Sequence, residues 1–240
     1  MSATATAPAL LSVQGLNQSY GGSHTLWDVA MAVPDGSCTC LMGRNGMGKT
    51  TLLKCIMGLL PVSGGEILLA GEDIAPKRAE ARAGLKVGYV PQGREIFPQL
   101  TVEENLRLAV YARKDKAHAV LDDIYAVFPV LKKMARRRGG DLSGGQQQQL
   151  AIGRALVIEP RLLILDEPTE GIQPNIVQEI GDIILRLNQE QGLTVLLVEQ
   201  KLPFARRVAT DFRIIDKGRM VADGPMPALD DDLIRRHLTV

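Results

Sequence analysis

Short apolar runs alternate with helical segments along the second half of the chain. Residues 161–167, 193–198 and 212–216 are apolar runs with the length and composition of strands. Residues 174–191 and 202–209, which lie between them, have the spacing of amphipathic helices. An earlier apolar run at residues 38–42 leads, after a glycine-rich stretch, into a helical segment at 51–57. This alternation predicts an α/β fold with a parallel sheet.

The first part of the chain has a different pattern. Residues 10–19 and 26–33 alternate or are rich in β-branched and aromatic side chains, and a glycine pair separates them, so we expect an antiparallel hairpin before the parallel sheet. Tyr20 ends the first of these strands beside two glycines. Its ring is either exposed enough to stack on a planar base or a half-buried strand-end tyrosine, and the pattern allows both. Residues 66–71 and 87–90 predict further strands, the second followed by Gln92.

A helical insertion is predicted from about residue 95 to about residue 150. Thr101 and Glu104 have the spacing of a capping box, and we expect Leu106, Leu108 and Val110 to begin an apolar stripe. The basic run at residues 132–138 is interpreted as a solvated helix end rather than as a contact with phosphate or an acidic partner.

A glycine-rich stretch carries the clearest chemical signal. It matches the phosphate-binding pattern G-x-x-x-x-G-K-[ST] between an apolar run and a helix, which is the context that the pattern requires and that an ordinary glycine-rich turn does not need. Glycines let successive N–H groups converge on an anion at a helix N-terminus. We expect Lys49 to reach the β- and γ-phosphates of a nucleotide, Thr50 to bind Mg²⁺ and Thr51 to bind a further phosphate oxygen. The stretch comprises Gly43, Arg44, Asn45, Gly46, Met47, Gly48, Lys49, Thr50 and Thr51.

A second helix start suitable for an anion lies near the end of the insertion. It consists of a hydroxyl and two glycines at the head of a helix, without a lysine or a position for a metal ligand. We therefore interpret it as half of a site. Its residues are Leu142, Ser143, Gly144, Gly145 and Gln146.

Two acids end the apolar run at residues 161–167. Carboxylates at the C-terminal end of a parallel strand lie at the edge where ligands bind. We expect Asp166 to bind Mg²⁺ and Glu167 to orient and deprotonate an attacking water. Gln92, just past another strand, could offer its carbonyl to the metal or to water, although a lone glutamine is no signal by itself.

Length and composition limit the number of domains, the class of partner and the location that the protein can have. With 240 residues, 45% hydrophobic and 23% charged, one large domain over residues 10–240 is a better interpretation than two small ones, after a disordered leader at residues 1–9. The net charge of +1 is too small to attract the whole protein electrostatically to nucleic acid or to a lipid surface. Three cysteines near the glycine-rich stretch indicate reduced packing residues rather than disulfides or a metal site. The start is not a signal or transit peptide, and no apolar stretch is long enough to span a membrane, so we expect a cytoplasmic protein, or one bound to a protein that spans.

Four motifs in this order resemble the ATP-binding-cassette (ABC) ATPases, over nearly the whole chain: GRNGMGKTT, YVPQ, LSGGQ and LLILDEPT. The resemblance implies a P-loop ABC ATPase with a RecA-like parallel-sheet core, an N-terminal antiparallel β element and an inserted helical subdomain. It implies that Tyr20 stacks on adenine, that Gln92 is the Q-loop residue, and that residues 143–146 are the signature that completes a partner chain's nucleotide site. Two chains would then enclose two ATP molecules, each with Mg²⁺.

Longer strings of the sequence are similar to the ATP-binding subunits of bacterial urea importers. Those importers are relatives of the branched-chain amino-acid importers, whose ATPase subunits are the alternative interpretation. Two positions depart from the wider family: Gln173 stands where an aspartate is usual, and Gln200 where the catalytic switch histidine is usual. The second departure resembles one of the two ATPases of branched-chain importers. It implies pairing with a second ATPase subunit, although a homodimer stays open.

The family resemblance further implies two membrane permeases, an indirect link to a periplasmic solute-binding protein, and a place on the inner face of the cell membrane. A soluble ABC ATPase of repair or translation is less favoured, since the chain has no coiled-coil insert, tandem copy or basic surface for nucleic acid. A P-loop GTPase or small-molecule kinase fits neither the LSGGQ helix nor the acid pair.

Overall fold

The structure is a computed structural model that describes residues 8–111 and 119–239. Most of the expected leader, residues 1–7, lies outside the described residues. The expectation fails at its last residue, because Ala9 already belongs to the first strand and pairs with Pro34.

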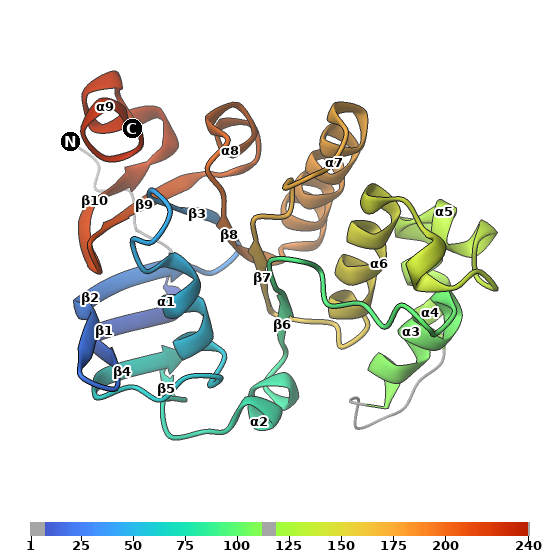
Figure 1. Ribbon diagram of the computed structural model, residues 1–240, viewed down its shortest axis with the longest axis horizontal. Coiled ribbons are helices and arrows are strands. Elements are labelled where there is room, and N and C mark those ends of the chain that lie inside the picture. The colour runs from blue at the N-terminus through green and yellow to red at the C-terminus, as the bar shows by residue number, and fades with distance from the viewer. Residues whose placement is uncertain (1–7, 112–118, 240) are drawn as a thin grey trace.

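A six-stranded sheet forms the centre of the molecule, in the order β10-β9-β3-β8-β7-β6 (Figure 1). All neighbouring strands are parallel except the β9–β10 pair. The expected α/β parallel sheet is therefore confirmed. The strands are β3 (Cys38–Met42), β6 (Val87–Val90), β7 (Leu162–Asp166), β8 (Thr194–Val198), β9 (Asp211–Asp216) and β10 (Arg219–Pro225).

A four-stranded antiparallel sheet contains the expected hairpin. Its order is β2-β1-β4-β5, and Gly21 and Gly22 join the two long strands. Along most of these two strands buried apolar residues alternate with exposed or half-buried ones, the alternation from which they were predicted, although Gln18 is buried and Trp27 is exposed. Their bounds are β1 (Ala9–Tyr20), β2 (Ser23–Pro34), β4 (Gly64–Leu69) and β5 (Glu72–Asp73).

Helices cover the central sheet on both faces. The described helices are α1 (Lys49–Ile56), α2 (Ala79–Gly84), α3 (Val102–Val110), α4 (Val120–Val127), α5 (Pro129–Lys133), α6 (Gly144–Leu156), α7 (Pro174–Gln191), α8 (Leu202–Val208) and α9 (Asp231–His237). Short 3-10 turns lie at Gly139–Asp141 and Met226–Ala228.

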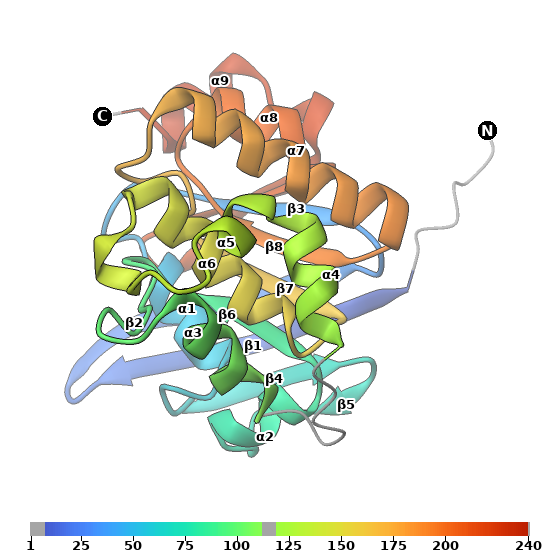
Figure 2. The same ribbon diagram turned by 90° about the vertical axis from the view of Figure 1, so that its right-hand side faces the viewer.

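Two apolar cores result from the alternation of side chains along the central strands. Leu162 and Ile164 of β7 face α1 and the antiparallel sheet, whereas Leu163 and Leu165 face the other core, which α3 to α8 complete. Figures 1 and 2 show α3, α4, α5 and α6 gathered beyond β6 and β7, on the side away from the antiparallel sheet.

The helical insertion differs in detail from its expected form. Its first helix starts with the expected capping box, in which Thr101 and Glu104 bond each other's backbone N–H. Helices α3 to α6 lie in the expected region and run from Val102 to Leu156. The expected apolar stripe is wrong at Leu108, which is 41% exposed, because positions two residues apart face different sides of a helix.

Candidate functional site

The glycine-rich loop lies between the C-terminal end of β3 and the start of α1. Gly43 has φ +152° and lies so close to β9 that a Cβ there would be 2.3 Å from the Ile215 carbonyl oxygen. Gly48, with φ +106°, caps α1 in a left-handed conformation. The ammonium of Lys49 folds back and donates to the carbonyls of Gly43 (2.7 Å) and Arg44 (2.9 Å). The loop is therefore closed around a buried cation.

A polar cavity of about 320 Å³ opens next to this loop. The motif residues on its wall come from the loop, from the start of α1 and from the ends of two further strands, as expected for the carboxyl edge of a parallel sheet. Thr25 and Glu170 also line it, and the sequence patterns gave no signal for either. The full lining is Thr25, Asn45, Gly46, Gly48, Lys49, Thr50, Thr51, Gln92, Glu167 and Glu170.

Asp166 ends β7 beneath this cavity, and its carboxylate is suited to a cation. Thr50 Oγ1 donates to one carboxylate oxygen at 3.3 Å, while the other oxygen is buried without a hydrogen-bond partner. Burial raises the Asp166 pKa to about 6, against a smaller lowering by the Thr50 hydrogen bond. A buried acceptor without a donor, beside a hydroxyl, fits the hard oxygen ligation that Mg²⁺ prefers.

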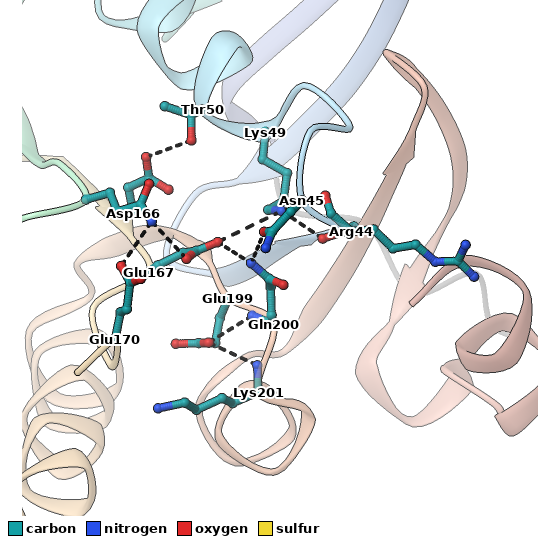
Figure 3. A network of polar contacts seen from close by, with 12 residues as sticks. Arg44, Asn45, Lys49, Thr50, Asp166, Glu167, Glu170, Glu199, Gln200 and Lys201 are labelled. Atoms are coloured by element: carbon teal, nitrogen blue, oxygen red, sulfur yellow. Dashed lines mark hydrogen bonds and ion pairs between the residues drawn. The ribbon is translucent and has the colours of Figure 1, made fainter. Parts of the chain in front are cut away.

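Glu167 is the point where the polar contacts of the site converge (Figure 3). One of its oxygens accepts from Gln200 Nε2 at 2.5 Å and lies 3.9 Å from the Lys49 ammonium. The other accepts from Gln92 Nε2 at 3.3 Å. Its backbone is left-handed, with φ +49°, which is costly for a residue with a side chain and is kept only where the surroundings fix it.

Lys49 places an ammonium group in the site, and its surroundings shift the pKa of that group. Burial lowers the Lys49 pKa, and the neighbouring carboxylates of Glu167 and Asp166 act in the opposite direction. An ammonium already stripped of water is ready to exchange its carbonyl partners for phosphate oxygens.

Gln200 follows β8 and bridges two parts of the site. Its amide nitrogen also donates to Asn45 Oδ1 at 2.7 Å, so it links the glycine-rich loop to Glu167. The turn is held from below by Glu199, a buried carboxylate that accepts from the backbone N–H of Gln200 and Lys201 and from Thr169 Oγ1 at 2.6 Å. Sequence reasoning missed Glu199, because an acid beside a glutamine has no motif of its own.

The second helix start begins α6 and lies outside this cavity. Ser143 caps the helix and forms a capping box with Gln146, whereas Leu142 is buried. Gly144 and Gly145 each lie close to a side chain of the same chain that leaves little room for a Cβ atom. A Cβ on Gly145 would lie 2.6 Å from Ile176 Cγ2 of α7, and one on Gly144 would lie 3.2 Å from a guanidinium nitrogen of Arg94.

Two other residues from the sequence are placed away from the polar contacts. Tyr20 ends β1 with 47% of its surface exposed, which agrees with the exposed alternative and leaves its ring free to contact a ligand. Gln173 is the N-terminal boundary residue of α7 and makes no side-chain cap there.

Comparison with known proteins identifies the family. The family model of ABC transporters matches residues 26–170, more than half of the chain. The chain belongs to the ABC transporter family. Members of this family hydrolyse ATP and use Mg²⁺, and the acceptor at Asp166 fits that cation.

Relatives and a solved structure extend the ABC match over most of the chain. It is 39% identical to the high-affinity branched-chain amino acid transport ATP-binding protein BraG of Pseudomonas aeruginosa, over 88% of this chain and 91% of that protein. It is also 39% identical to the probable branched-chain amino acid transport ATP-binding protein LivF of Archaeoglobus fulgidus, over 90% and 92%. A solved ATP-binding subunit of an ABC transporter, 30% identical, superimposes with a TM-score of 0.80 and covers 95% and 92% of the two chains. Within the described residues, no helix is long and apolar enough to cross a membrane.

Proposed function

We propose that this ABC ATPase drives an importer of branched-chain amino acids. The observation that carries the cargo class is the 39% identity to two proteins named for branched-chain amino acid transport, over about nine tenths of the chain. Urea, the cargo expected from the resemblance of the motif strings, has weaker support, because both relatives are named for branched-chain amino acid transport. The cargo itself would bind to other subunits, since the polar cavity of this chain would hold the phosphates of the nucleotide.

The ATP phosphates would occupy the cavity beside the glycine-rich loop. Lys49 would leave the Gly43 and Arg44 carbonyls for the β- and γ-phosphates, while loop N–H groups, the start of α1 and Thr51 bind the remaining oxygens. Thr50 and Asp166, with the carbonyl oxygen of Gln92, would hold Mg²⁺. When bound, the cation offsets the negative charge of the phosphates.

Glu167 would act as the general base. Its side chain lines the cavity, and hydrogen bonds from Gln200 and Gln92 fix its direction. A carboxylate so held can orient a water molecule toward the γ-phosphate and take its proton. Gln200 would position Glu167 and, through Asn45, keep the glycine-rich loop in register with it; its amide could also donate to the γ-phosphate.

The helix start at residues 142–146 would complete the nucleotide site of a second ATPase chain. It is a capped helix N-terminus that lies outside this chain's own cavity, so a phosphate bound there would belong to another chain's nucleotide. Tyr20 would stack on the adenine of this chain's ATP. We favour a heterodimer with a different ATPase, because Gln173 and Gln200 replace the usual residues. The pair would sit on two permeases at the inner face of the membrane, with a solute-binding protein outside.

Cargo-stimulated hydrolysis tests the proposed function. The chain would be assembled in vesicles with its permease subunits, its second ATPase and the solute-binding protein, and ATP turnover measured with leucine or urea. We expect leucine to stimulate turnover and urea to leave it at the basal rate. Stimulation by urea alone would overturn the branched-chain assignment, and no turnover with either would overturn the importer motor.

A further inference from the structure

Arg94 joins three parts of the chain that are distant in sequence. One guanidinium nitrogen donates to Gln147 Oε1 on α6 at 3.1 Å, and another donates to the carbonyl of Glu170 at 3.2 Å. The guanidinium also packs against Gly144, the first residue of α6. The planar fork of an arginine can satisfy two acceptors at fixed angles, which a lysine cannot do.

The backbone that carries Arg94 is held in an uncommon conformation. Gly93, Arg94 and Glu95 all have positive φ, at +84°, +73° and +47°. The turn is closed by the N–H of Arg94 on the Pro91 carbonyl, and Arg154 of α6 donates to the Glu95 carbonyl at 2.7 Å. Two non-glycine residues in succession adopt left-handed backbone only where the surroundings fix them, so the direction of the Arg94 side chain is set by the fold.

The Arg94 turn begins at the nucleotide cavity. Gln92, two residues before Arg94, lines the cavity and donates to the carboxylates of Glu167 and Glu170. Arg94 binds the backbone of the same Glu170. A ligand that draws Gln92 toward the phosphates therefore moves the backbone that carries Arg94, and one that draws Glu170 moves the carbonyl to which Arg94 donates. The Arg94 side chain is at the same time hydrogen-bonded to Gln147 near the start of α6.

We propose that Arg94 is a positioning residue that couples nucleotide binding in this chain to the orientation of its own α6 start. This inference rests on the proposed function, because the α6 start matters to catalysis only if it completes a partner's site. Gly144 serves the coupling by its size: a side chain there would meet the guanidinium, and the contact between Arg94 and the helix start would be lost.

Hydrogen–deuterium exchange on the isolated chain tests the coupling without any partner. Exchange would be followed at residues 43–51 and 143–149, with and without a non-hydrolysable ATP analogue and Mg²⁺. In the wild-type chain both segments should change, the second by about five- to a hundredfold, the usual range of coupling between sites. Arg94→Ala should keep the change at residues 43–51 and reduce that at 143–149 to less than about twofold. Gln147→Leu, which removes the acceptor on α6, should give the same loss.

Two variants complete the test. Arg94→Lys keeps the charge and should restore the change only in part, and Arg78→Ala, at an exposed arginine before α2, should behave as the wild type. An unaltered response of residues 143–149 in both Arg94→Ala and Gln147→Leu would overturn the coupling and leave the proposed function intact. A wild-type chain without protection at residues 43–51 would instead overturn the nucleotide site.

Discussion

Replacing Gln200 by alanine should slow ATP hydrolysis by about tenfold or more while leaving ATP affinity nearly unchanged. The amide makes two hydrogen bonds, to the Glu167 carboxylate at 2.5 Å and to the Asn45 side chain at 2.7 Å. A bond to a charged group contributes about 1.5–3 kcal/mol, and a neutral one about 0.5–1.5 kcal/mol. The Asn45 oxygen can take water in place of the amide, so the bond to the base dominates the change in rate.

Exposure decides which part of that range applies. Gln200 lies at the surface in the isolated chain, where water weakens the bond, so about 1.5 kcal/mol and a tenfold loss are expected. In an assembled complex that excludes water, the loss should approach a hundredfold. Gln200→His replaces the amide with a group that titrates, so its rate should gain a pH dependence near pH 6.5 beyond that of the wild-type enzyme, in which Asp166 already has a pKa of about 6.

Steady-state ATPase rates from pH 5.5 to 8.5, alone and in the complex, provide the measurement. Gln191→Ala, a glutamine exposed at the end of α7, is the matched control and should keep the wild-type rate. If Gln200→Ala hydrolysed ATP as fast as the wild type, the hydrogen bond to Glu167 would have no part in turnover.

Three further outcomes follow from the geometry. Lys49→Ala should weaken ATP binding by about ten- to a hundredfold, measured with a fluorescent ATP analogue, because it removes a charge-assisted donor to the phosphates; unchanged affinity would contradict that role. Burial raises the pKa of Cys38 to about 12 and that of Cys55 to about 11, so a thiol reagent at pH 8 should label neither quickly until the chain is unfolded, and rapid labelling of the native chain would contradict this. Gly145→Ala should lower the melting temperature, because its methyl group meets Ile176 at 2.6 Å; overpacking costs about 1–3 kcal/mol, against at most about 1 kcal/mol gained in helix propensity. A raised melting temperature would mean that Ile176 moves aside.

The phosphate loop and the acid pair were predictable because their placement depends on local spacing. An apolar strand places its final residues at the carboxyl edge of a parallel sheet whatever the rest of the chain does. Asp166 ends such a strand, and Lys49, Glu167 and Gln92 come after one. Lys49, Glu167 and Gln92 line one cavity, and Asp166 is hydrogen-bonded to Thr50 of the same lining.

The contacts that hold these residues could not be predicted in the same way. Arg94 binds a side chain 53 residues away and a backbone carbonyl 76 residues away. Glu199 binds Thr169, 30 residues away, and these two residues follow the neighbouring strands β8 and β7. Their partners are therefore fixed by packing rather than by spacing. Thr25 lies on β2 and reaches the cavity through the packing of that strand against the loop, where Leu26 lies beside Gly48. These residues belong to common types without a motif, and one sequence gives no means to select them.

Two elements, β10 and α9, were not predicted, because their local patterns are weak. β10 alternates exposed and half-buried positions on the sheet edge and is not rich in apolar residues, and no buried residue marks α9. Leu108 was misplaced because its neighbours at positions 106 and 110 are both apolar, a run that has the period of a strand inside a helix.

Single-turnover hydrolysis by Glu167→Gln tests the central claim most directly. Glu170→Gln is the matched control, since Glu170 lines the same cavity and also accepts a hydrogen bond from Gln92. With ATP binding measured in parallel, Glu167→Gln should bind MgATP as tightly as the wild type and hydrolyse it at least about a hundredfold more slowly, whereas Glu170→Gln should keep most of its activity. Hydrolysis by Glu167→Gln at the wild-type rate would contradict the account.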